Sequence, residues 1–208
     1  MKISVNIGKQ NKIHILCDGE YKFTVDAEYW YGSPYHGIEL INDEEQAAFF
    51  DAVGSRCAFI AGLRLLSYRD HSEKELVTKL VQKGHKKEYA LNAVDRLKEF
   101  RYIDDERVAE IYAKDLFERK GMSINGIVSE LCRKGISREI ALEAAGKLDN
   151  EPILRIIDLI RKKYFRYLDD EKGVRKTVAA LQRLGYRWSD IQSALRQYEV
   201  ETEEFSDV

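Results

Sequence analysis

The sequence predicts a mainly α-helical protein in which tandem three-helix repeats form an elongated array, preceded by a small β-rich N-terminal extension. Three glycines, Gly84, Gly135 and Gly185, lie 51 and 50 residues apart, and a leucine stands four residues before each of them. Apolar or aromatic side chains also recur six, ten and thirteen residues after each glycine. A period of this length with helical internal spacing is typical of a tandem helical array. Such arrays present a long surface to a partner, which favours a binding function over catalysis.

The N-terminal extension has the alternation of apolar and polar side chains that strands require. Residues 3–25 contain three such runs, and Asp18-Gly19 separates the last two. This dipeptide is a strong hairpin signal, because a two-residue turn needs positive φ at its centre. We expect a small antiparallel sheet to about residue 41, with the aromatic residues of 29–35 covering one face. A ligand cage is the alternative for these aromatic side chains.

A helix is expected to link the extension to the first repeat. Asn42 is followed by three acidic residues, which places a capping side chain and negative charge at the positive end of a helix dipole. The helix is expected to end at about Ser67. The predicted domains are residues 1–57 (the sheet and the start of the linking helix), the repeats 58–103, 104–150 and 151–198, and an acidic tail at 199–208.

In the first repeat, the signals for the start and end of the middle helix are explicit. The stretch from Ser72 to Glu75 predicts a capping box, in which the serine oxygen and the glutamate carboxylate each accept from a free amide. The helix ends at Lys83, and Gly84 is expected in the left-handed conformation that favours glycine. A third helix is expected over residues 86–100.

The second and third repeats follow the same plan. In the second, helices are expected at about residues 104–120, 123–134 and 137–148. In the third, Pro152 opens the first helix, where its missing amide is harmless, and Gly185 separates the last two helices.

Charge is unevenly distributed along the chain. Residues 1–57 carry 5 Lys/Arg and 9 Asp/Glu, residues 58–198 carry 29 and 22, and residues 199–208 carry five acids and no base. Much of the basic surplus lies in residues 151–198, with 11 bases and 6 acids. A basic middle indicates an acidic partner such as nucleic acid or an acidic protein groove. The alternative is that the helices have ordinary charged, solvated faces.

The sequence lacks the patterns of an enzyme or a metal protein. Cys17, Cys57 and Cys132 form no C-x-x-C pattern, which predicts reduced thiols in a cytoplasmic protein. The four histidines form no i, i+3 or i, i+4 pair, and no phosphate-binding or nucleophile-elbow motif occurs. The triplets starting at Asp104 and Asp169 are explained as helix caps. We therefore expect a protein without enzymatic activity and without a cofactor.

No membrane segment is expected. The N-terminus lacks the apolar core of a signal peptide, and the longest apolar run, Cys57 to Leu66, contains Arg64 and is too short to cross a bilayer.

The most basic stretch interleaves cations with aromatic residues. Between Arg161 and Tyr167 stand four cations and three aromatic residues, and further cations follow to Arg187. Such a surface can neutralise phosphates while its aromatic rings stack on bases. The alternative is that Tyr164, Phe165 or Leu168 belong to the core and the cations extend around them into solvent.

A helix, a glycine turn and a second helix also describe the helix-turn-helix unit of DNA-binding proteins. In that unit the second helix reaches base edges and tolerates phosphates. The corresponding helix of the second repeat balances Arg138 and Lys147 against Glu139 and Glu143. Groove reading by all three repeats is therefore not expected.

Three segments carry a resemblance to a known family. They are the run from Leu66 to Gly84, the Tyr102-Ile103-Asp104-Asp105 motif, and the stretch from Glu130 to Ile136. At these separations the chain resembles the bacterial RecX family of regulatory proteins over about residues 58–198, and the β-rich extension resembles that of Gram-positive members. Two positions depart from the family pattern: His71 replaces a common arginine, and Leu184 replaces the lysine before the third glycine.

The resemblance implies a cytoplasmic, monomeric regulator that binds the RecA filament on DNA and limits its recombination and ATPase activities, within recombination, DNA repair and the SOS response. The family motifs fix no contact residues, so charge and position select the expected partner- or DNA-binding residues. These are Arg69, Lys83, Arg133, Lys134, Arg161, Lys162, Arg166, Lys172, Arg175, Lys176, Arg183 and Arg187. Two alternatives stay open: a helical protein that binds single- or double-stranded nucleic acid without RecA, and a protein scaffold.

Overall fold

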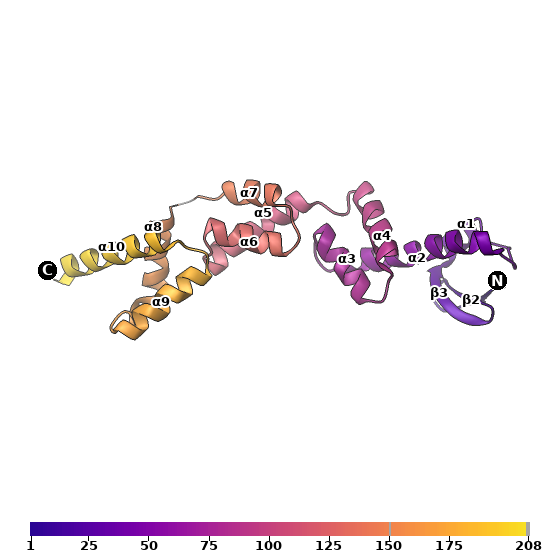
Figure 1. The fold of residues 1–208 in the computed structure, drawn as a ribbon, viewed down its shortest axis with the longest axis horizontal. Helices are drawn as coiled ribbons and strands as arrows, with labels where there is room; N and C mark the ends of the chain where they lie inside the picture. Colours follow the sequence, from indigo (N-terminus) through magenta and orange to yellow (C-terminus); the bar gives the residue numbers. More distant parts are fainter. Residues whose placement is uncertain (150, 207–208) are drawn as a thin grey trace. The chain divides into compact units, whose positions relative to one another are not determined.

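The computed structural model describes residues 1–149 and 151–206, which form two compact units (Figure 1). The first unit comprises Met1–Asp104 and the second begins at Asp105. The mainly helical class and the small N-terminal sheet are as predicted.

The N-terminal sheet has three antiparallel strands in the order β1-β2-β3. They are β1 (Ile3–Ile7), β2 (Lys12–Cys17) and β3 (Glu20–Asp26). Asp18 and Gly19, between β2 and β3, have φ values of 50° and 84°. Positive φ at both central residues is what a two-residue type I′ hairpin turn requires. The hairpin prediction is confirmed.

The sheet ends earlier than predicted. Within the segment predicted as sheet to about residue 41, α1 (Ala27–Gly32) follows β3 directly, and beyond α1 the pairing among the described residues is limited to an isolated bridge between Lys2 and Leu40. The reason is local: the Asp26 carboxylate accepts from the Tyr29 amide at 2.9 Å and so caps the helix. Trp30 of α1 is buried against the sheet.

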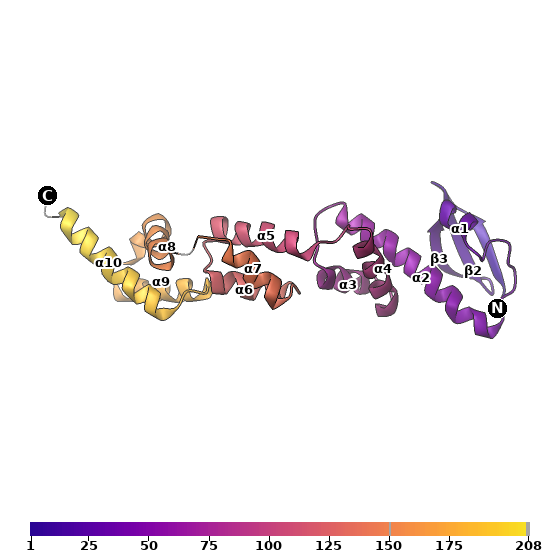
Figure 2. The same ribbon diagram turned by 90° about the horizontal axis from the view of Figure 1, so that it is seen from above.

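The helix α2 (Asp43–Leu66) links the sheet to the first repeat within the first unit (Figure 2). Asn42 and Glu45 form a capping box at its start. Phe49 and Val53, in its first half, pack with the sheet residues. Ala58 and Phe59, in its second half, pack with the helices of the repeat. One helix therefore serves two hydrophobic cores, which fixes the sheet relative to the first repeat.

The repeat glycines end their helices in the same way three times. In the first repeat Gly84 lies between α3 (Glu73–Gln82) and α4 (Lys87–Glu99). Gly84, Gly135 and Gly185 have φ values of 93°, 92° and 91°. Each glycine amide bonds the carbonyl three residues before it at 2.9 Å, and the next amide bonds the carbonyl five residues before it at 3.2 Å. This pair of bonds is a Schellman motif, so the predicted left-handed caps are confirmed.

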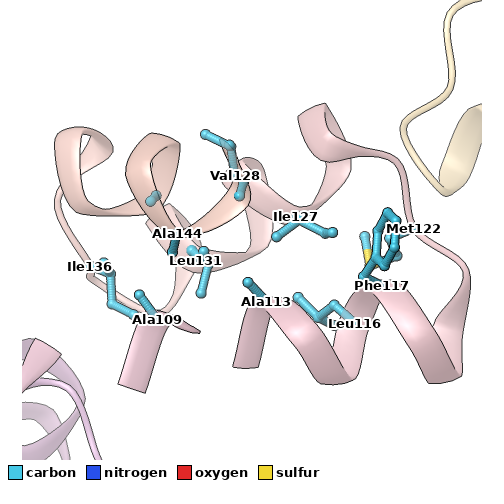
Figure 3. Packing of buried hydrophobic residues seen from close by; sticks show 12 residues of the cluster. Ala109, Ala113, Leu116, Phe117, Met122, Ile127, Val128, Leu131, Ile136 and Ala144 are labelled. Carbon is cyan, nitrogen blue, oxygen red and sulfur yellow. The ribbon is translucent and has the colours of Figure 1, made fainter. Parts of the chain in front are cut away.

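The second repeat has one feature that the sequence did not predict. The helix α5 (Asp105–Asp115) passes directly into a π-helical turn, η1 (Leu116–Lys120), before Gly121 ends it. Two helices follow, α6 (Ile124–Arg133) and α7 (Arg138–Gly146). Figure 3 shows Ala113 and Leu116 pointing towards Ile127. All three side chains are buried in the hydrophobic core of the second repeat.

The third repeat has the same kind of π turn. Its elements are α8 (Pro152–Leu159), the π turn η2 (Ile160–Tyr164), the short 3₁₀ helix η3 (Phe165–Tyr167), α9 (Glu171–Arg183) and α10 (Trp188–Ser206). The helix α10 continues into the segment that was predicted to be a separate acidic tail.

Candidate partner-binding surface

The second and third repeats are joined by close backbone packing within the second unit. The amide of Ser123 donates to the carbonyl oxygen of Leu184 at 3.0 Å. A Cβ atom on Gly185 would lie 2.5 Å from the Cα of Gly126, so a larger residue at either glycine meets backbone. The turn between α9 and α10 is therefore seated on the start of α6.

Side chains reinforce this junction. The Tyr186 hydroxyl donates to the carbonyl oxygen of Gly121 at 3.0 Å in a buried position. Arg155 donates to the carbonyl oxygen of Phe117 at 2.7 Å, and its guanidinium lies 3.3 Å from the centroid of the Phe117 ring. Burial raises the pKa of Tyr186, and nearby Arg155 opposes that shift. The third repeat is thus held to the second by contacts at three places.

The predicted contact residues are divided between the two units. Arg69 and Lys83 lie in the first unit and the other ten lie in the second, so neither unit carries all twelve. Arg69 donates to both carboxylate oxygens of Glu75, at 2.5 and 3.3 Å. Lys83 is exposed at the C-terminus of α3.

In the second repeat the two predicted cations lie at the end of α6. Arg133 pairs with Glu130 at 2.6 Å. The ammonium of Lys134 lies 4.5 Å from the centroid of the Tyr112 ring. A partner that binds these cations must compete with their contacts inside the repeat. This competition lowers the contribution of each cation to the free energy of binding.

Several cations of the third repeat also have contacts within the chain. Lys162 pairs with Asp158 at 2.7 Å, and Arg175 pairs with Glu171. Arg183 donates from Nε to the carbonyl oxygen of Ala179 at 3.2 Å, and Arg166 lies over the ring of Phe165 at 5.3 Å. Arg161 is exposed on the π turn η2.

Three of the predicted cations of the third repeat have no such contact among the described residues. Lys172, Lys176 and Arg187 are exposed, and none has an ion-pair partner among residues 1–149 and 151–206 as described. Lys172 and Lys176 lie one helical turn apart on α9, so they project from the same side of that helix. These cations can meet an external anion without first breaking a pair.

The aromatic residues of the basic stretch divide between core and surface. Tyr164 and Leu168 pack against the core of the third repeat, as the core interpretation predicted. Phe165 and Tyr167 are 46% and 56% exposed, which fits the stacking interpretation. Trp188 is 53% exposed and was not among the predicted contact residues. Its signal was available, because the equivalent positions of the other repeats hold cations, Lys87 and Arg138.

The described part of the chain contains no group of three or more His, Cys, Asp or Glu side chains arranged to hold a metal ion. Within the same residues, no helix combines the length and the apolar character that crossing a membrane requires.

Comparisons with known proteins agree with the repeats. The family model for the first three-helix domain of RecX matches residues 58–97, and the model for the second matches residues 104–144. A regulatory protein RecX of Clostridium perfringens strain 13 is 30% identical over 154 residues, which cover 71% of this chain and 70% of that protein. The chain belongs to the RecX family. A regulatory protein RecX of Caldanaerobacter subterraneus subsp. tengcongensis is 28% identical over 190 residues, covering 90% of this chain and 93% of the relative.

Solved RecX structures have the same fold. A crystal structure of regulatory protein RecX aligns with a TM-score of 0.65 at 22% identity, covering 92% of this chain and 98% of the other. RecX from Lactobacillus salivarius aligns with a TM-score of 0.60 at 22% identity, covering 72% and 99% respectively. Membership of the RecX family supports a regulatory role for this chain.

Proposed function

We propose that this RecX-family chain binds the RecA recombinase filament assembled on DNA and limits its recombination and ATPase activities. The regulatory family is the observation that carries the proposal. The basic surplus of the repeats supports it, because a filament on DNA is a polyanionic partner whose charge attracts cations over several positions.

The third repeat contributes the contact surface in this proposal. Its cations without internal partners, Lys172, Lys176 and Arg187, approach phosphates or acidic side chains at the filament surface. Neighbouring Trp188 and Tyr167 are exposed and offer flat apolar contact. Aromatic residues and cations together are the usual composition of strong contacts in protein and nucleic-acid interfaces.

The second candidate function is binding of nucleic acid without RecA. The exposed rings of Phe165, Tyr167 and Trp188 among cations favour it, because stacking on unpaired bases needs such rings. The two functions differ in what the protein must recognise. A filament regulator acts at concentrations that leave the DNA uncoated, whereas a DNA-binding protein acts by coating it.

The deciding experiment measures ATP hydrolysis by RecA on single-stranded DNA while this protein is titrated in, with DNA binding by the protein alone measured in the same buffer. Loss of hydrolysis at concentrations that do not coat the DNA supports the filament proposal. Unchanged hydrolysis despite tight, steeply salt-dependent DNA binding supports the second function. If the protein neither changes hydrolysis nor binds DNA at low salt, both of these functions are contradicted and a protein scaffold remains.

A matched pair of variants tests the surface. The triple variant Lys172→Glu, Lys176→Glu and Arg187→Glu reverses three exposed cations whose loss breaks no internal pair. The control variant Lys9→Glu, Lys74→Glu and Lys87→Glu changes the net charge equally at three exposed positions of the first unit. We expect the third-repeat variant alone to lose inhibition at physiological salt. Equal inhibition by both variants contradicts the assignment of this surface.

A further inference from the structure

The first unit contains a cavity of about 720 Å³ that the proposed function does not use. It is lined by strands β2 and β3, one side of α2, and the turn between α3 and α4. Its volume lies in the range of sites that hold small ligands or a few residues of a peptide. The cavity therefore has the size of a binding site.

Cations dominate the charge of this cavity. Six Lys or Arg residues line it against one acid, Asp26. The acid is already paired, because Arg56 donates to both of its carboxylate oxygens at 3.0 and 3.1 Å. Lys22 pairs with Glu20 at 2.8 Å. The remaining four cations are Lys12, Arg64, Lys83 and Lys86.

These four cations are available to a ligand. In the described structure, Lys12, Arg64 and Lys83 have no ion-pair partner. Lys86 lies over the ring of Tyr89 at 5.3 Å, and it too has no ion-pair partner among the described residues. Like charges gathered around one cavity repel each other, and an anionic ligand relieves that repulsion.

The remainder of the lining is apolar. Phe23, Phe50 and Ile60 are half-buried, and they present carbon rather than polar atoms to the cavity. Cys57 adds a thiol that donates to the carbonyl oxygen of Thr24 at 3.3 Å. The site therefore suits a ligand that carries an apolar group together with negative charge.

The spread of the cations selects an extended ligand. Two cations of α2 mark the length of the cavity: Arg56, which is paired with Asp26, and Arg64, which is not, lie eight residues apart, about 12 Å along a helix. Lys12 comes from the sheet, and Lys83 and Lys86 come from the turn after α3. A single phosphate group can contact only some of the cations that line the cavity. A peptide of about four extended residues, at roughly 3.3 Å each, matches this span.

The surroundings disfavour a long polyanion. Residues 1–57, which supply the sheet and half of α2, carry 9 acids against 5 bases. This net negative charge disfavours a polyanion that extends beyond the cavity, whereas a short peptide keeps its charge beside the cations that line it. We propose that this cavity binds a short acidic peptide segment of a partner protein, with an apolar side chain of the segment packed against Phe23, Phe50 and Ile60.

The test uses the full chain alone, without recombinase or DNA, so its outcome is independent of the proposed function. The probe is a fluorescein-labelled hexapeptide in which four glutamates flank a central leucine-phenylalanine pair, and binding is followed by fluorescence anisotropy. Three comparison probes are used: the same peptide with glutamine for glutamate, a hexaglutamate, and an oligothymidylate of equal net charge. We expect saturable binding of the first peptide and at least tenfold weaker binding of the other three.

Matched variants locate the binding. Arg64→Glu with Lys83→Glu reverses two exposed cations of the cavity, and Lys9→Glu with Lys74→Glu reverses two exposed cations outside it. We expect the first pair to weaken peptide binding at least tenfold and the second to leave it unchanged. Equal loss in both pairs, or equal binding of hexaglutamate, indicates general electrostatic attraction and overturns the site. Tighter binding of oligothymidylate that is lost in the first pair assigns the cavity to nucleic acid and overturns the peptide.

Discussion

Gly185 and Gly126 are in direct backbone contact: a Cβ on Gly185 would lie 2.5 Å from both the Cα and the amide nitrogen of Gly126. Gly185 also has a φ of 91°, so two independent requirements select glycine at this position. The contact seats the α9–α10 turn on α6, and Arg183 and Arg187 flank that turn. The placement of these two cations therefore depends on a pair of residues that carries no charge.

The first prediction concerns this contact. Gly185→Ala is expected to destabilise the second unit by about 2–5 kcal/mol, because the left-handed backbone costs about 1–2 kcal/mol and overpacking against backbone costs about 1–3 kcal/mol. The matched control is Gly84→Ala in the first unit, where φ is 93° but no atom lies within 4 Å of the added Cβ. That variant is expected to lose only the backbone contribution. Calorimetric unfolding of the two variants measures the difference.

An equal loss of stability in the two variants would mean that the α6 contact contributes nothing beyond backbone conformation. In the proposed function, Gly185→Ala also displaces Arg187. It should therefore weaken inhibition of RecA more than Gly84→Ala does.

The second prediction concerns the buried hydroxyl of Tyr186. Tyr186→Phe removes the 3.0 Å bond to the carbonyl oxygen of Gly121 and leaves that oxygen without this donor. A loss of about 1–3 kcal/mol in the free energy of unfolding is expected. Tyr167→Phe, at a ring that is 56% exposed, is the control and should unfold like the original chain. Urea denaturation of both variants provides the measurement.

Alkaline pH gives an independent check on the same residue. Burial raises the pKa of Tyr186, so the folded chain prefers the neutral phenol more than the unfolded chain does. This contribution to stability is complete below the ordinary pKa near 10 and is lost as pH rises through the raised value. The loss of stability at alkaline pH should be smaller in Tyr186→Phe. An identical alkaline profile in that variant would show that the phenol is not responsible.

The sequence predicted those features that depend on local backbone chemistry. The three repeat glycines and the Asp18-Gly19 hairpin need positive φ, which is a property of the residue itself, and all are in the predicted turns. The caps at Asn42 and Ser72 were equally local, and both side chains accept from the amide three residues on. Patterns of this kind require no knowledge of what packs against the segment.

Features that depend on tertiary contacts were not predicted. The π turns η1 and η2 change hydrogen bonding within a continuous helix without interrupting the apolar sequence, so the pattern gives no sign of them. The sequence left the core and the stacking interpretation open for both Tyr164 and Phe165, and only Tyr164 packs with the core of the third repeat. The cationic cavity was missed because its lining spans Lys12 to Tyr89, residues that only the folded α2 brings together.

The third prediction concerns a buried histidine. His71 is 3% exposed, and its Nδ1 lies 3.1 Å from a carboxylate oxygen of Glu75. Burial lowers the pKa of His71, and Arg69 and Lys79 add to the lowering while Glu75 opposes it. The folded chain therefore binds the proton less readily than the unfolded chain. Stability of the first unit should be complete above pH of about 6.5 and should fall as pH drops below it.

The check is a set of urea denaturations between pH 5 and 8, conditions chosen around the ordinary pKa of histidine of about 6.5. His71→Gln should reduce the decline in stability on the acidic side, because glutamine does not titrate; the remainder is expected from His85, whose pKa is also lowered by burial. His36→Gln, at an exposed histidine, should leave the decline unchanged. A decline of unchanged size in His71→Gln would assign it to other groups.

The last prediction concerns the reactivity of the thiol in the cationic cavity. Burial raises the pKa of Cys57 to about 11. The thiolate is the reactive form, so at pH 8 only about one thiol in a thousand is ionised at this position. Alkylation of Cys57 by iodoacetamide, followed by mass spectrometry of its peptide, should be slow at pH 8 and rise about tenfold per pH unit up to pH 10.

The single-cysteine variant Cys17→Ser, Cys132→Ser restricts alkylation to Cys57. The hexapeptide that fills the cavity should slow the reaction further, and hexaglutamate should not; fast, pH-independent alkylation would show that Cys57 is not buried as described.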